Sequence, residues 1–102
     1  MYRASDRVDN AVWLDRLDDA CATLDFDEEV FTTATDLFLS QAPDSEQGKR
    51  VTAAASLYAA ALIRGQERSQ SAVADAMDVS RLSVQKRWKP ILEDAGFSPP
   101  TW

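Results

Sequence analysis

The sequence predicts an all-α protein with five helices in one domain. No segment shows the sustained alternation of apolar and polar residues that is typical of a half-buried strand, and apolar residues instead recur every three or four positions. The chain has 102 residues, of which 45% are hydrophobic and 27% charged, and this suits a single globular domain over residues 1–102. Residues 98–102, which include two prolines, form a short predicted C-terminal tail.

The first predicted helix covers about Asp6 to Leu24, with Ser5 as its N-cap. Its apolar stripe consists of Val8, Val12, Leu14, Leu17, Cys21 and Leu24, with Trp13 beside it. Cys21 lies on this stripe, so we interpret it as a small buried side chain rather than a reactive thiol.

The second predicted helix covers about Glu28 to Ser40. Asp27 is placed to cap it, and the two glutamates of its first turn suit the positive end of the helix dipole. Phe26 precedes the cap and can pack against Phe31 as a hydrophobic staple.

The third predicted helix covers about Lys49 to Arg64, after a loop that ends at Gly48, and Gly65 is its predicted stop. Its middle is apolar or small on every side, which is typical of the central helix of a bundle. We therefore expect nearly complete burial of Ala54, Leu57, Ala61 and Leu62.

The fourth predicted helix runs from the cap Ser69 to about Met77, and the fifth from the cap Ser80 to about Ala95. Only three residues separate them, and this outline is that of a helix-turn-helix. Asp78 stands where the turn needs left-handed geometry, which Asp tolerates. We expect Pro90 to kink or loosen the last helix. The predicted inward-facing residues are Val73, Ala74, Met77, Val84, Trp88, Ile91 and Leu92, with Val79 under the turn.

The composition argues against most enzymes and most bound cofactors. The chain has no histidine, a single cysteine and no glycine-rich loop, which leaves no zinc site, nucleophile pair or phosphate loop. We therefore expect no enzymatic activity, no cofactor, no metal and no small-molecule substrate. The chain shows neither a run of about 20 apolar residues nor a signal peptide, so we expect no membrane contact and a cytoplasmic location.

Charge is unevenly distributed along the chain, whose net charge is −6. Residues 1–47 carry 12 acidic and 3 basic side chains, whereas residues 48–102 carry 5 and 8. Within the second part, the ten residues from Ser80 to Lys89 hold four bases and no acid, which indicates a contact for phosphates or for an acidic partner. Twelve aspartates against three lysines favour a salt-adapted, archaeal, halophilic source, because such a surface stays hydrated when salt screens its charges.

Three segments resemble a known family: AAASLYAAALIRG at 53–65, SQSAVADAMDVS at 69–80 and LSVQKRWKPIL at 82–92. Over residues 48–96 the chain is similar to the second cyclin-like repeat of archaeal transcription factor B. The resemblance implies a five-helix cyclin-like bundle around a central third helix. It also implies double-stranded DNA and the TATA-binding protein, or other transcription machinery, as partners. The zinc ribbon and the other repeat of that family have no counterpart in these 102 residues.

In that family the fifth helix reads promoter DNA beside the TATA box. By this resemblance Leu82 takes an apolar base-contact position, and Gln85 stands where the family has a base-reading arginine. A glutamine there would favour adenine over guanine, and a leucine can touch a thymine methyl. The complete set of candidate DNA contacts is Arg81, Lys86, Arg87 and Lys89 for phosphates, Leu82, Ser83 and Gln85 for bases, and Ser69 and Gln70 for the backbone.

Two functions remain open at this stage. The first is a single-repeat protein that binds DNA or a promoter complex with its fifth helix. The second is a protein-interaction module of the same fold that does not bind DNA, because the acidic first half would repel a duplex but attract a basic partner. The position of the acids separates the two, since acids on the face of the fifth helix would oppose DNA binding.

Overall fold

The computed structural model describes residues 10–41, 43 and 45–97, and every regular element in this part of the chain is a helix. The helices are α2 (Ala11–Thr23), α3 (Glu28–Gln41), α4 (Glu46–Ile63), α5 (Gln70–Met77) and α6 (Arg81–Asp94). Their order and approximate bounds agree with the five predicted helices, which confirms the all-α class. The predicted tail 98–102 lies outside the described residues.

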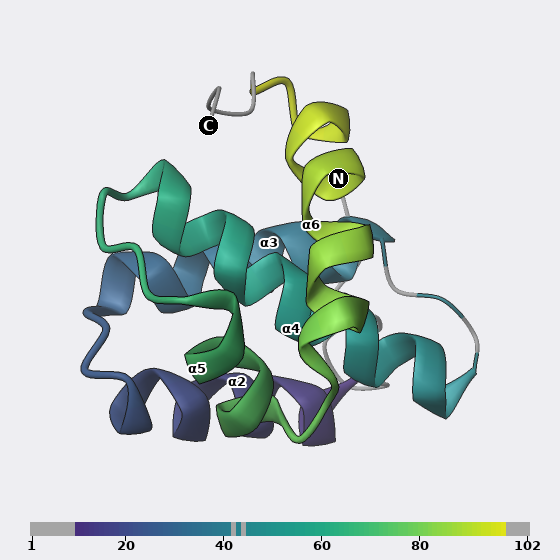
Figure 1. Ribbon diagram of the computed structural model, residues 1–102, viewed down its shortest axis with the longest axis horizontal. Coiled ribbons are helices and arrows are strands. Elements are labelled where there is room, and N and C mark those ends of the chain that lie inside the picture. Colours follow the sequence, from purple (N-terminus) through teal and green to yellow (C-terminus); the bar gives the residue numbers. More distant parts are fainter. Residues whose placement is uncertain (1–9, 42, 44, 98–102) are drawn as a thin grey trace.

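Helix α4 is the centre of the fold. It packs against all four of the other helices, most extensively against α3 and α6. In Figure 1 it crosses the middle of the molecule, with α3 behind it and α6 in front. Its side chains are buried without interruption from Val51 to Ala61. The prediction of a buried third helix is therefore confirmed.

The ends of α4 differ from expectation. Leu62 is only half-buried, whereas Ala54, Leu57 and Ala61 are fully buried, because the last turn of α4 leaves the bundle. The helix also begins earlier than the glycine suggested. Ser45 is the N-cap and accepts a hydrogen bond from the Gly48 backbone N–H at 3.0 Å.

Gly48 therefore lies within α4 rather than at the end of a loop. A Cβ atom at this position would stand 2.7 Å from the Oγ of Ser45 and 2.8 Å from the Cγ of Pro43. Both distances are too short for a real contact, so the glycine leaves room for the cap and for the proline ring that precedes it.

The buried face of α2 differs at one position from the predicted apolar stripe. Trp13 and Leu17 are buried, but Val12 is 61% exposed. At about 100° per residue, the bulky indole takes the inward position and the neighbouring valine is carried to the surface. Asn10 is the N-cap of the described helix, and the earlier expected start, including Ser5 and Val8, lies outside the described residues.

The connection from α2 to α3 is tight and well bonded. Asp25 has a φ of 58° and ends α2 in left-handed geometry. Asp27 caps α3 as expected, because its Oδ1 accepts a hydrogen bond from the Val30 N–H at 3.2 Å. Phe26 and Phe31 are both half-buried against the core. These contacts hold the two N-terminal helices at a fixed angle.

The α5–α6 pair has the expected turn. Asp78 adopts φ 58° and ψ 47°, the left-handed region, and the Oγ of Ser80 caps α6 by accepting from the Ser83 N–H at 3.1 Å. The predicted inward side chains are all buried: Val73, Ala74, Met77, Val84, Trp88, Ile91 and Leu92. Helix α6 continues through Pro90 to Asp94.

Candidate nucleic-acid interface

Helix α6 presents one long face to the exterior. Its core side is formed by Val84, Trp88, Ile91 and Leu92. At about 100° per residue, Lys86 falls nearly opposite this side, and Leu82 lies one turn before Lys86. Leu82 is 54% exposed. The outermost line of α6 therefore combines an aliphatic and a cationic side chain.

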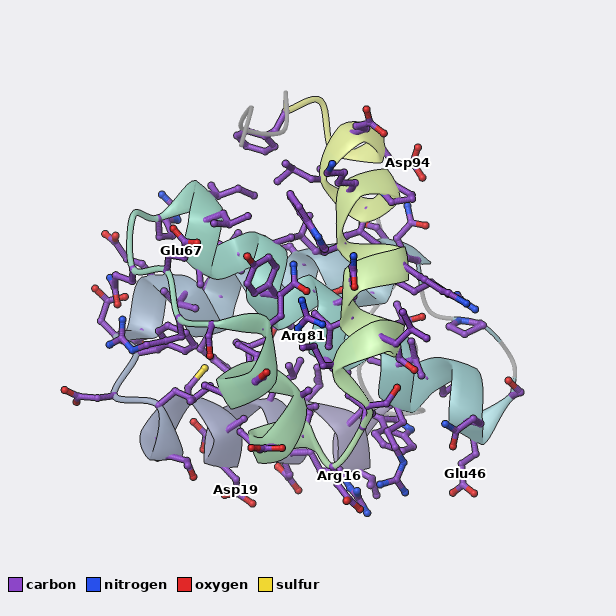
Figure 2. All side chains as sticks on the ribbon, in the orientation of Figure 1. Arg16, Asp19, Glu46, Glu67, Arg81 and Asp94 are labelled. Atoms are coloured by element: carbon purple, nitrogen blue, oxygen red, sulfur yellow. The ribbon has the colours of Figure 1, made fainter. Side chains whose placement is uncertain are left out.

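The predicted contact residues of α6 divide between the outer line and its two flanks. Of the seven, six are exposed and only Ser83 is half-buried. Arg81, Gln85 and Lys89 share one flank, and Figure 2 shows Arg81 on the side of α6 that faces α5. Arg87 lies on the other flank, in a pocket with residues from the end of α3 and the start of α4. The outer line of α6 and its two flanks, together called the ridge, therefore carry all four basic residues of this helix.

Two of these side chains also have structural contacts. The hydroxyls of Ser80 and Ser83 are 2.8 Å apart, so Ser83 takes part in the cap of α6. The Nζ of Lys89 lies 5.5 Å from the centroid of the Trp88 ring. That ring meets Tyr58 of α4 edge-on, with centroids 5.4 Å apart, and this contact fixes α6 against the central helix.

The two candidates at the start of α5 are less available. The Oγ of Ser69 accepts a hydrogen bond from the Ala72 N–H at 3.0 Å and caps the helix. Gln70 is half-buried, and its Oε1 is buried without a hydrogen-bond partner. Burial raises the pKa of Tyr58, and a hydrogen bond from the Gln70 side chain partly opposes this rise. Gln70 thus faces the interior beside Tyr58, while Ser69 stays at the surface.

The described part of the chain shows little that would support other kinds of site. It contains no group of three or more His, Cys, Asp or Glu side chains arranged to hold a metal ion. Among the same residues, no helix is both long enough and apolar enough to cross a bilayer.

Comparison with known proteins agrees with the helical fold. The family model "Transcription factor TFIIB repeat" matches residues 14–94, which include nearly all of α2 and the four helices after it. The chain belongs to this family. Over 56 residues it is also 38% identical to "Transcription initiation factor IIB 2" of Thermococcus kodakarensis, a match over 55% of this chain and 18% of the relative. This TFIIB repeat therefore spans a small part of that relative, and it is related to transcription initiation factors.

Six acids of this TFIIB repeat lie on α2 and α3. Helix α3 and α6 pack on opposite sides of α4 (Figure 1). Asp19 lies on α2 at the lower edge of Figure 2. The nearest acids along α6 itself are Glu93 and Asp94 in its last turn, and Asp94 accepts a hydrogen bond from Gln41 at 3.3 Å. Closer to the N-terminal end of α6 are Asp75 of α5 and Asp78 of the α5–α6 turn, both exposed, and Asp78 is paired with Arg50.

Sequence reasoning missed two basic residues beside the α5–α6 turn. The Nη1 of Arg50 lies 3.2 Å from the Oδ2 of Asp78, the left-handed turn residue. The guanidinium of Arg50 also lies 5.7 Å from the Trp13 ring centroid, and that of Arg16 lies 5.0 Å from it. These contacts join α2, α4 and the turn. The two contacts of Arg50 span 37 and 28 positions of the chain, so no local pattern could have revealed them.

Proposed function

We propose that this TFIIB repeat binds double-stranded DNA as part of a promoter complex, with α6 in the major groove. The observation that carries the proposal is the exposed ridge of α6, where four bases surround Leu82 and Gln85 with no acid between Ser80 and Lys89. The family match supports a role in transcription initiation. The TATA-binding protein is the partner that this role suggests.

Each side chain of the ridge has a specific task in the proposal. Leu82 contacts a thymine methyl, and Gln85 hydrogen-bonds to adenine. Arg81, Lys86, Arg87 and Lys89 contact phosphates on either side of the groove. Ser83 and Ser69 add contacts from the two helix caps, and Gln70 adds one only if its amide turns outward. The recognition helix is held rigidly because Trp88 and Val84 lock it to the core.

The net charge of −6 opposes DNA binding at low salt. The Asp-rich, Lys-poor composition supports a salt-adapted archaeal cytoplasm as the setting. In strong salt the Debye length falls to about 3 Å at 1 M, so repulsion from the distant acids is screened. Close contacts between α6 and bases then contribute more than long-range attraction.

The test is a salt series of binding to promoter and random duplexes, with and without the TATA-binding protein. Gln85→Ala is expected to relax sequence preference at one base pair by about 1–3 kcal/mol. Lys86→Ala is expected to weaken binding to all sequences alike and to reduce the salt slope by about one. Arg64→Gln, which removes a charge at the C-terminal end of α4, is the matched control and is expected to leave the affinity and the salt slope unchanged.

A second candidate is a protein-interaction module that does not bind DNA. The exposed Leu82 favours it, because a protein partner could cover an aliphatic side chain as well as a base could. If the wild-type chain shows no salt-dependent binding to any duplex, alone or with the TATA-binding protein, the DNA proposal is abandoned in favour of this module.

A further inference from the structure

We propose that a pocket between α2 and α3 binds a basic segment of a partner protein through one apolar anchor residue. The pocket has a volume of about 400 Å³ and opens at the junction of the two helices. Cys21, Phe26 and Phe31 form its apolar part, and Asp18, Asp27 and Glu28 supply carboxylates around it. The proposal does not rest on DNA binding, because α6 contributes nothing to this pocket.

The apolar part of the pocket is an incompletely covered piece of the core. Cys21 is 5% exposed, and Phe26 and Phe31 are half-buried against the core cluster. A partner side chain that enters the pocket would remove the remaining ring surface from water. Burial of an aliphatic or aromatic side chain is favourable by roughly 25 cal/mol per Å² of apolar surface. The anchor of the partner is therefore an apolar residue such as leucine or phenylalanine.

The charges around the pocket select the residues beside that anchor. Three carboxyl groups line the pocket, and no basic side chain does. Asp18, Asp27 and Glu28 are all exposed, and Asp27 is held in place by hydrogen bonds from the Val30 N–H and the Gln66 side chain. Burial, with smaller contributions from Asp18 and Asp27, raises the pKa of the Cys21 thiol to about 11. The smaller contributions show that Asp18 and Asp27 both act on this lining residue.

The chain already shows how an arginine is accommodated next to this pocket. The guanidinium of Arg68 lies 5.0 Å from the centroid of the Phe26 ring, and its Nε donates to the Leu24 carbonyl at 3.1 Å. Arg68 does not line the pocket. Phe26 thus combines one cation contact from the chain itself with ring surface that remains free for a partner.

The same features argue against other occupants. Carboxylates repel nucleic acid, and the described residues lack the grouped ligands that a metal needs. At low salt a second copy of the chain is disfavoured because two molecules of net charge −6 repel each other. In Figure 1 the α2–α3 junction lies at the left, far from α6 at the right. A duplex on α6 would therefore leave the pocket open, and the repeat could join DNA to a basic protein.

The experiment is an NMR titration of the full ¹⁵N-labelled chain, at the lowest salt that keeps it folded. The probe is a nine-residue peptide with a central leucine, two arginines on each side and serines elsewhere. We expect amide shifts centred on Asp18, Cys21 and residues 26–31, with submillimolar affinity that falls as salt rises. A peptide with alanine in place of leucine, or glutamates in place of arginines, is expected to bind at least about tenfold more weakly.

Matched variants test the carboxylates. Asp18→Asn with Glu28→Gln removes two charges that line the pocket and is expected to weaken the peptide about five- to tenfold. Asp19→Asn with Glu29→Gln removes the same charges one residue along each helix, outside the lining, and is expected to change affinity by less than about twofold. Circular dichroism melting curves of both variants check that the fold is kept.

Three results would overturn the proposal. The first is the absence of pocket shifts at millimolar peptide, and the second is an equal loss of affinity in the two double variants. The third is concentration-dependent shifts of the pocket amides without peptide, together with a dimer in sedimentation, which would assign the pocket to a second copy. Repeating the titration with saturating duplex separates this result from the DNA proposal, because peptide binding is expected whether or not α6 binds DNA.

Discussion

Helices α4 and α6 lie side by side, yet they divide stability and recognition between them. In α4 the eleven residues from Val51 to Ala61 are all buried, and most of them are small. In α6 only four of the fourteen residues are buried, and two of these are the large Trp88 and Leu92. Small side chains let the neighbours of α4 approach from every direction, whereas a few large side chains fix one side of α6 and leave the rest free.

This difference predicts which measurement each helix controls. A change inside α4 disturbs contacts with four other helices, so it is expected to alter the free energy of unfolding. A change on the outer line of α6 meets only solvent, so it is expected to alter binding and leave the fold intact. Substitutions at Leu57, Pro90 and Leu82 test this division, and a pH series at Cys21 tests the core beside it.

Truncation of Leu57 is expected to have the largest effect. Leu57 is fully buried in α4, and Leu57→Ala leaves a cavity that the packed helices can close only in part. The free energy of unfolding is expected to fall by about 2–5 kcal/mol, measured by urea denaturation. A loss below about 1 kcal/mol would show that the centre of the bundle is loosely packed.

Replacement of Pro90 is expected to stabilise the chain. Helix α6 runs through Pro90 to Asp94, and a proline at this position cannot donate the backbone hydrogen bond that would reach the Lys86 carbonyl. Pro90→Ala is expected to raise the free energy of unfolding by up to about 3 kcal/mol. If it lowers stability instead, contacts made by the proline ring stabilise the end of α6 more than the missing hydrogen bond destabilises it.

Raising the pH is expected to destabilise the buried interior through Cys21. The pKa of its thiol is about 11 in the folded chain against an ordinary value of 9.0. Between these values the unfolded chain has lost the proton that the folded chain keeps, so stability falls as pH rises, by an amount on the order of 2 kcal/mol. The measurement compares urea denaturation of the wild type and Cys21→Ala from pH 8 to pH 11. Equal slopes in the two proteins would contradict the expectation.

Truncation of Leu82 is the counterpart to Leu57 and is expected to have the smallest effect on stability. Leu82 is 54% exposed, so Leu82→Ala removes the same atoms from a site without tight packing. We expect a change within about 0.5 kcal/mol in unfolding, but weaker binding of duplexes that carry the contacted thymine. A large loss of stability would mean that the α6 ridge belongs to the core.

Much of the fold follows from local pattern. The alanine-rich run predicts the central helix, and Asp78 predicts the left-handed turn, because both depend on neighbouring residues alone. The predictions that were wrong concern positions where neighbouring residues compete for the same space. Gly48 looked like a loop residue, but its missing Cβ makes room for the Ser45 cap and the Pro43 ring. Val12 and Trp13 competed for one inward position, and periodicity cannot say which of two adjacent apolar residues takes it.

The candidate site was predictable only where it lies on one helix. The basic ridge of α6 is visible in the sequence because four bases and no acid fall within the ten residues from Ser80 to Lys89. The contacts of Arg50 with Trp13 and Asp78 join three separate elements, so they require the folded arrangement. The same holds for the pocket between α2 and α3, whose walls meet only after the left-handed turn at Asp25. The position of Gln70 also depends on its packing beside Tyr58, and the sequence alone does not reveal this packing.

The central place of α4 also constrains how the chain folds as it is synthesised. Helices α2 and α3 leave the ribosome before α4, and in the native state they pack mainly against α4 and against each other. Until residue 63 has emerged, these two helices lack the complete α4 as a partner and have only each other. Native packing then begins around α4, and α6 closes the bundle last. We therefore expect substitutions within α4 to slow folding, and substitutions in the buried side of α6 mainly to speed unfolding.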